Sequence, residues 1–181
     1  MTAYTFNMPS GIAGDVSRSE HAIVEAALLS ATVLPIAYGV PVKTVSAKIQ
    51  GITTGDTIAY PYAGANVLVT GFLVRAYPTN SAQDALGAQT MPTSGIVDVL
   101  KKGYMMVHVG FNAASCAKDG LVYVRVANNS SGHSSTTTYP PGQIEGTADT
   151  TAADTLAIPR CFFTGAADAQ GFCEISFNII G

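Results

Sequence analysis

The sequence predicts an all-β protein, either an antiparallel jelly-roll-like sandwich or a small β-barrel, with an extended N-terminal arm. From residue 42 onward, apolar residues recur with period two or in short runs, as they do in β-strands. Clusters of Gly, Pro, Asn and Asp separate these runs, as turns do. No segment of this part has room for a long helix. We therefore expect a single folding unit with an arm at 1–41 and a β-domain at 42–181.

The arm differs in composition from the rest of the chain. Ser17-Arg18-Ser19-Glu20 has the form of a capping box, and the Ala-rich segment from His21 to Ala31 has good helix propensity. Pro35 and Pro41 interrupt this pattern after little more than two turns, and so short a helix is marginal without tertiary packing. We favour an extended conformation here, with a short helix as the local alternative.

The strands of the β-domain follow in order. They are expected at Val42 to Ile52, Asn66 to Tyr77, Tyr104 to Phe111, Leu121 to Ala127, Leu156 to Thr164 and, as a closing strand, Gly171 to Ile180. Gly71 indicates a bulge or bend in the second of these. The turn triplet Lys118-Asp119-Gly120 predicts a hairpin-like pairing of the third and fourth strands. Asn128 to Gly142 is almost wholly polar and is expected to form a mobile surface loop.

Charge is scarce throughout the chain. Only 12% of residues are charged, about half of the roughly 25% usual in soluble domains. Such a surface is expected to be partly covered by partner subunits, although a coat of Ser, Thr, Asn and Gly would explain the composition equally well. The net charge is −3 and there is no basic field, so nucleic acid is not an expected partner.

The N-terminus lacks the basic and apolar regions of a secretory signal, which predicts synthesis in a cytoplasm. The most apolar stretch, Ala22 to Tyr38, contains Glu25 and Pro35 and is at the lower limit of length for crossing a bilayer. A membrane partner is therefore not expected.

The cysteines do not indicate a disulfide framework or a zinc site. Cys116, Cys161 and Cys173 are odd in number and have no metal-ligand spacing, so buried free thiols are expected.

The sequence offers no catalytic motif. The three histidines, His21, His108 and His133, fall in separate segments, and no nucleophile elbow or phosphate-binding glycine loop is present. The late acids, which could meet in the fold, are interpreted as solubilising loops; they are Asp149, Asp154, Asp168 and Glu174. We therefore assign no catalytic, cofactor-binding or metal-binding residue.

Several stretches are similar, in the same order, to a known family. They are Gly11-Ile-Ala-Gly-Asp-Val-Ser-Arg18, Tyr38-Gly-Val-Pro-Val42, Gly103-Tyr-Met-Met-Val-His-Val109, Gly120-Leu-Val-Tyr-Val-Arg-Val126 and the closing part from Ile144 to Ile179. On these stretches the chain resembles the structural cement, or capsid decoration, proteins of bacteriophages. None of them is a chemical signature, and the specificity lies in their combination and order.

The resemblance implies a β-domain that binds the outer surface of a shell of major capsid protein, bridges capsomers and stabilises the head. It also implies a homodimer or homotrimer, a location in the virion after synthesis in the host cytoplasm, and no cofactor or turnover. An extended arm could reach the shell by adding to an exposed sheet edge. The candidate interface residues in the arm are Ile12, Arg18, Ile23, Val24 and Leu34.

Two other classes of function are compatible with parts of the sequence. A carbohydrate-binding or adhesin-like β-domain of a virion or cell surface could use the eight Tyr residues for stacking, although the absence of Trp counts mildly against it. An enzyme on a jelly-roll scaffold could use His108 and the late acids, but it lacks a paired ligand motif.

Overall fold

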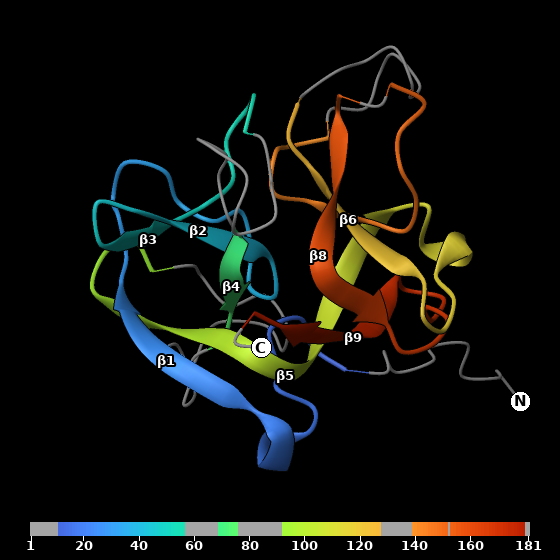
Figure 1. Ribbon diagram of the computed structural model, residues 1–181, viewed down its shortest axis with the longest axis horizontal. Helices are drawn as coiled ribbons and strands as arrows, with labels where there is room; N and C mark the ends of the chain where they lie inside the picture. Colours follow the sequence, from blue (N-terminus) through green and yellow to red (C-terminus); the bar gives the residue numbers. More distant parts are fainter. Residues whose placement is uncertain (1–10, 57–68, 76–91, 128–138, 152, 180–181) are drawn as a thin grey trace, which may run out of the picture.

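The computed structural model describes residues 11–56, 69–75, 92–127, 139–151 and 153–179 (Figure 1). Within these ranges the chain forms strands and two short 3-10 turns, and no α-helix. The strands are β1 (Ile23–Leu28), β2 (Pro41–Val45), β3 (Lys48–Gln50), β4 (Val69–Leu73), β5 (Ile96–Phe111), β6 (Leu121–Arg125), β7 (Ile144–Glu145), β8 (Thr155–Phe163) and β9 (Phe172–Asn178). The turns are η1 (Ser19–His21) and η2 (Ala113–Ser115). The all-β prediction is confirmed.

Five of the strands close into a barrel. Their order is β5-β7-β6-β8-β9, and β9 returns to pair with β5 over residues 102–108. The β5–β7 pair is parallel and the other four pairs are antiparallel, so the barrel is mixed. The small barrel is thus the architecture that the chain adopts.

Strand β5 joins the barrel to an outer group of strands, which continue the sheet beyond it (Figure 1). Its first part pairs with β1 on one edge and with β4 on the other, and β2 and β3 follow β4. Gly103 lies where β5 passes from β1 to β9, and its φ is +135°. A Cβ there would lie 3.0 Å from Ala22 Cα, so the close approach of the two segments favours glycine.

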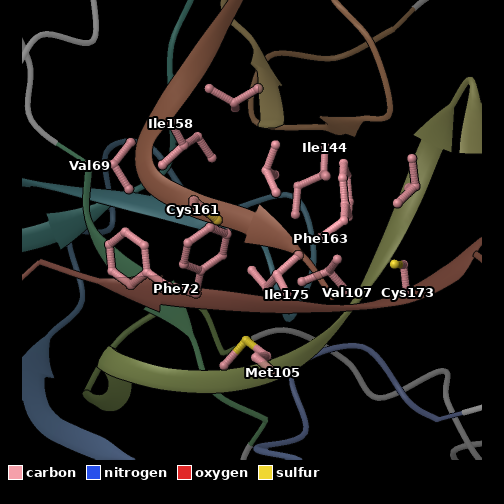
Figure 2. Packing of buried hydrophobic residues seen from close by; sticks show 14 of the residues in the cluster. Val69, Phe72, Met105, Val107, Ile144, Ile158, Cys161, Phe163, Cys173 and Ile175 are labelled. Carbon is pink, nitrogen blue, oxygen red and sulfur yellow. The ribbon is translucent and has the colours of Figure 1, made fainter. Parts of the chain in front are cut away.

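The main core fills the barrel. Figure 2 shows Phe72, Cys161 and Ile175 among the buried side chains of this cluster. The ring of Phe72 meets that of Phe177 edge to face, with 4.9 Å between the centroids. A second cluster lies under the outer strands and includes Leu73 and Val99. The cysteines are buried and free, as predicted.

The predicted hairpin of β5 with β6 is wrong, because β7 lies between them. Ile144 of β7 pairs with Val109 on one side and with Val124 on the other. Ile144 is buried in the core, so its burial holds this two-residue strand in the gap. Most of the expected loop at 128–142 lies outside the described residues; the described part, 139–142, ends in a turn at Gly142 with φ +94°.

The bulge expected at Gly71 is confirmed. Val42 of β2 pairs with Gly71 but Lys43 pairs with Val69, which leaves one extra residue on β4. A Cβ on Gly71 would lie 2.4 Å from Val99 Cγ1. The closing strand is also confirmed, since β9 completes the barrel with Cys173, Ile175 and Phe177 facing inward.

The segment before β2 is extended where it pairs with the domain. The N–H of Gly14 donates to the carbonyl of Met106, and Val16 bridges Met105. β1 then runs antiparallel to β5. Pairing with β5 therefore overrides the local helix preference of the Ala-rich segment.

Candidate interaction surface

Strand β1 forms an exposed edge of the sheet. All six of its residues are exposed or half-buried. One edge pairs with β5, from Val24 opposite Leu100 to Leu28 opposite Ile96. In the described part of the chain, no strand pairs with the other edge of β1. The N–H and C=O groups along that edge are therefore placed to receive a partner strand.

One face of β1 is apolar and open to solvent. Ala27 pairs with Val97 and packs against the second core cluster, so one face is covered at this end of β1. The opposite face carries Val24 and Leu28 of β1 and the facing Ile96, which are 41%, 47% and 77% exposed, with Ala26 and Asp98 paired between them. We call these three residues the β1 strip. Single exposed apolar residues are ordinary, but a row of them beside an unpaired edge is typical of an interaction surface.

The five expected interface residues do not form one group. Ile23 and Val24 begin β1, and both are more than 40% exposed. Leu34 is 36% exposed and lies in the connection between β1 and β2. Ile12 is half-buried in the turn before Val16. The structure thus places Val24 in the β1 strip and Ile23 next to it at the start of β1, and it places the other expected residues elsewhere on the segment.

Arg18 is bonded within its own chain. Its Nη2 lies 2.6 Å from Glu174 Oε2 and its Nε lies 3.2 Å from Oε1. The guanidinium also stacks over the ring of Tyr104, 4.1 Å from the centroid. Partial burial alone would raise the pKa of Glu174, but hydrogen bonds from Arg18, Ser17 and Thr164 hold that pKa below its usual value. Arg18 therefore clamps the segment before β1 onto the barrel.

The sequence reasoning missed Leu28 and Ile96. Leu28 lies in the Ala-rich segment for which no paired strand was expected, and Ile96 lies before the strand expected at Tyr104 to Phe111. The alternation of apolar residues in Ile96-Val97-Asp98-Val99 is a usable signal for a strand. It does not reveal which face remains uncovered.

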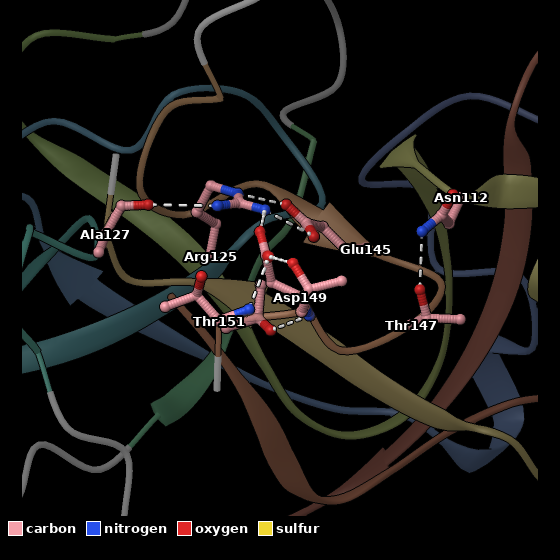
Figure 3. Close-up of polar contacts among 9 residues, drawn as sticks. Asn112, Arg125, Ala127, Glu145, Thr147, Asp149 and Thr151 are labelled. Carbon is pink, nitrogen blue, oxygen red and sulfur yellow. Dashed lines mark hydrogen bonds and ion pairs between the residues drawn. The ribbon is translucent and has the colours of Figure 1, made fainter. Parts of the chain in front are cut away.

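A buried ionic cluster lies between β6, β7 and the loop after β7 (Figure 3). The side chains of Arg125, Glu145 and Asp149 are fully buried. Nη2 of Arg125 lies 3.0 Å from Glu145 Oε2 and 2.7 Å from Asp149 Oδ2. The Tyr139 ring also lies near the guanidinium, 5.3 Å from centroid to Cζ. These groups bond to one another and are shielded from solvent. The cluster therefore stabilises the fold by holding residues 139–149 against the barrel.

The interpretation of the late acids as loop solubilisers is wrong for Asp149 and Asp154, which are 8% and 5% exposed. Asp149 is buried because Arg125 compensates its charge. Asp168 instead holds a turn by accepting from the N–H groups of Gln170 and Phe172.

The described residues offer no evident centre for chemistry. They contain no group of three or more His, Cys, Asp or Glu side chains placed to hold a metal ion. His108 is an exposed residue of β5 whose ring packs against Phe172, 5.2 Å between centroids; His133 lies outside the described residues. A search of the described ranges for an apolar helix of membrane-spanning length finds none.

Comparison with known proteins gives a matching family and solved chains of similar fold. The model of the family described as "Structural cement protein (E217 gp24/Pam3 gp6)" matches residues 1–178. A chain of the solved structure "The capsid of Myoviridae Phage XM1" superposes with a TM-score of 0.66 at 18% identity, covering 99% of this chain and 97% of that one. At this identity the likeness shows a shared fold. The search of curated proteins found no match.

Proposed function

The chain belongs to the structural cement proteins of bacteriophages, which are non-enzymatic, and from this premise we propose that it binds the outer surface of the major capsid protein shell, bridges capsomers and stabilises the head. The family makes the chain a component of the phage capsid. The partner, the bridging and the outer position are the proposed part. The family assignment also favours this function over the carbohydrate-binding and enzymatic alternatives.

The observation that supports shell binding is the β1 strip beside an unpaired strand edge. A strand of a capsid neighbour could pair with β1 through main-chain hydrogen bonds, while its side chains cover Val24, Leu28 and Ile96. Each half-exposed apolar side chain that becomes covered contributes roughly 1 kcal/mol. One such contact is weak, but a subunit that touches two capsomers gains from both at once.

The other candidate residues fit supporting roles in this proposal. Ile23 extends the apolar surface at the start of β1, and Ile12 and Leu34 flank it along the same segment. Arg18 would contribute indirectly, because its bonds to Glu174 hold the segment that leads into β1. In this proposal, residues 1–41 are the arm that contacts the shell, and residues 42–181 form the β-domain.

Self-association on the shell, as a homodimer or homotrimer, is the second part of the proposal. In a homodimer the contact would be isologous, with the same surface of each copy facing its counterpart, and that surface must differ from the β1 edge that pairs with the shell. Light scattering of the purified chain, with and without shells, would separate a preformed oligomer from one that assembles on the capsid.

The direct experiment is decoration of purified phage shells that lack this protein. We expect wild-type protein to bind the shells at saturable occupancy and to raise the temperature at which they lose integrity. Cryo-electron microscopy of decorated shells would show β1 against the major capsid protein. Shells that bind no wild-type protein, or that bind it without any gain in stability, would contradict the proposed function.

A further inference from the structure

A row of paired residues crosses the outer surface of the barrel on strands β5, β9, β8 and β6. Tyr104 of β5 pairs with Ser176 of β9, Ser176 pairs with Phe162 of β8, and Phe162 pairs with Leu121 of β6. Phe162 and Leu121 are 39% and 45% exposed. The barrel therefore presents an aromatic ring in the middle of one outer face.

A groove of about 460 Å³ lies beside Phe162, and we call it the Phe162 groove. Its lining includes His21, Lys102 and Arg160 and contains no Asp or Glu. A second hollow of about 370 Å³ shares Phe162 and is lined by Lys118, by Asp119 and by Arg18, whose charge is paired with Glu174. In a chain of net charge −3, a groove lined by Lys102 and Arg160 and by no acidic side chain is a local reversal of sign.

The backbone conformation of Arg160 is a second indication that this side chain has a role in binding. Its φ is +55°, a left-handed conformation that disfavours a side-chain-bearing residue other than Asn or Asp. Two residues, Pro159 and Arg160, separate the buried Ile158 and Cys161, so β8 bulges here. Glycine would suit this bulge better. Strained residues of this kind are concentrated at binding and catalytic sites, and here the strain places Arg160 in the lining of the groove.

We propose that the Phe162 groove binds an acidic segment of the shell protein, with its carboxylates facing Lys102 and Arg160 and an apolar side chain packed against Phe162. This inference rests on the proposed function and adds the chemical character of the partner. The lining supports it through charge complementarity. Continuity supports it as well, because Lys102 lines the groove and is also the partner of Ile23 in the β1–β5 pairing. The start of strand β1 and the groove thus adjoin along β5.

The test is a charge reversal of the groove, Lys102→Glu with Arg160→Glu, in binding to shells that lack the protein. Exposed ion pairs are individually weak, and reversal converts two attractions into two repulsions. We expect about tenfold weaker shell binding at low salt, with a smaller dependence on salt than in the wild type. The matched control is Lys48→Glu, an exposed charge on β3 outside the groove, which should bind like the wild type.

Short poly-L-glutamate serves as a probe that does not depend on shells. Fluorescence or calorimetry should detect its binding to the wild type and to Lys48→Glu, and a loss of at least about tenfold in the groove variant. Circular dichroism and thermal melting confirm that each variant is folded. Equal shell binding by the wild type and a folded groove variant overturns the groove proposal and leaves the proposed function intact. Failure of wild-type protein to bind shells overturns both.

Discussion

Leu28 of β1 lies directly opposite Ile96 of β5, and neither side chain is covered although both belong to a paired strand. One step along the same pair, Ala27 and Val97 turn toward the second core cluster. The period-two geometry of the pair thus separates a buried face from an apolar face that meets solvent. A pair of exposed aliphatic side chains at an edge strand is a hazard for unwanted association. Its presence in a capsid protein is consistent with a neighbour that covers it.

The first prediction concerns this pair. Leu28→Ser with Ile96→Ser should change the free energy of unfolding by no more than about 1 kcal/mol, because both side chains are already largely exposed. The same double variant should lose most of its occupancy on shells, because the apolar contact with the neighbour is removed. Thermal melting and a sedimentation assay with shells measure the two effects.

Val45→Ser provides a matched control, since Val45 is 42% exposed but lies at the end of β2. It should decorate shells like the wild type. Normal occupancy of the Leu28 and Ile96 variant would remove the β1 strip from the interface.

The second prediction concerns the buried ionic cluster. Arg125→Met leaves Glu145 and Asp149 as two buried carboxylates without their cation, and breaking a buried pair in this way typically costs about 3 to 5 kcal/mol. A loss of this size would remove a large part of the stability of a typical domain. Denaturant unfolding measures the difference. Arg18→Met removes an exposed guanidinium that is paired with Glu174 and should reduce stability far less, because exposed ion pairs contribute little. Similar losses in the two variants would show that burial of the cluster is not decisive.

The third prediction concerns pH. The folded-state pKa of Glu174 is lower than its ordinary value of 4.5 because Arg18, Ser17 and Thr164 bond to the ionised form, against the opposing effect of partial burial. A carboxyl whose pKa falls on folding stabilises the fold above its unfolded pKa, and this contribution is lost as pH falls through the folded pKa. Glu174→Gln should therefore be less stable than the wild type at pH 7, by less than about 1 kcal/mol because Arg18 is half exposed. The gap should narrow as the pH falls below 4.5. A gap that stays constant from pH 7 to the acid limit of folding would contradict the assignment.

The sequence was most informative where a strand pattern is local. The inward residues of β9 alternate along the chain, and Gly71 interrupts an otherwise β-branched run, so both the closing strand and the bulge could be predicted. β7 could not, because two residues give no period, and its parallel pairing with β5 depends on the burial of Ile144. Arg125 also escaped prediction. A lone Arg between two valines suggests an outward residue, and its partners are 20 and 24 residues away.

The interface was only partly predictable for a related reason. Ile23 and Val24 were expected from their apolar character, and they do lie at the exposed edge. Phe162, in contrast, lies between the buried Cys161 and Phe163 and faces outward by strand alternation, after the bulge at Pro159 and Arg160 has shifted the phase of β8. Which face of a barrel strand meets solvent is set by closure of the barrel, and closure involves pairs distant in sequence.

The fourth prediction separates the strain at Arg160 from its charge. A side chain in the left-handed region costs about 1 to 2 kcal/mol of stability, and glycine removes this cost. Glycine itself lowers stability by about 0.5 to 1 kcal/mol, because it gives the unfolded chain more conformational freedom. Arg160→Gly should therefore be as stable as the wild type or more stable by up to about 1 kcal/mol. Arg160→Ala keeps the unfavourable φ of +55° and should show no such gain. If the groove binds an acidic segment, both variants lose the same cation and should weaken shell binding to a similar extent. Melting temperatures and shell affinities of the two variants, measured side by side, test both parts. Lower stability of the glycine variant together with unchanged affinity would mean that Arg160 serves the fold and that the groove does not need it.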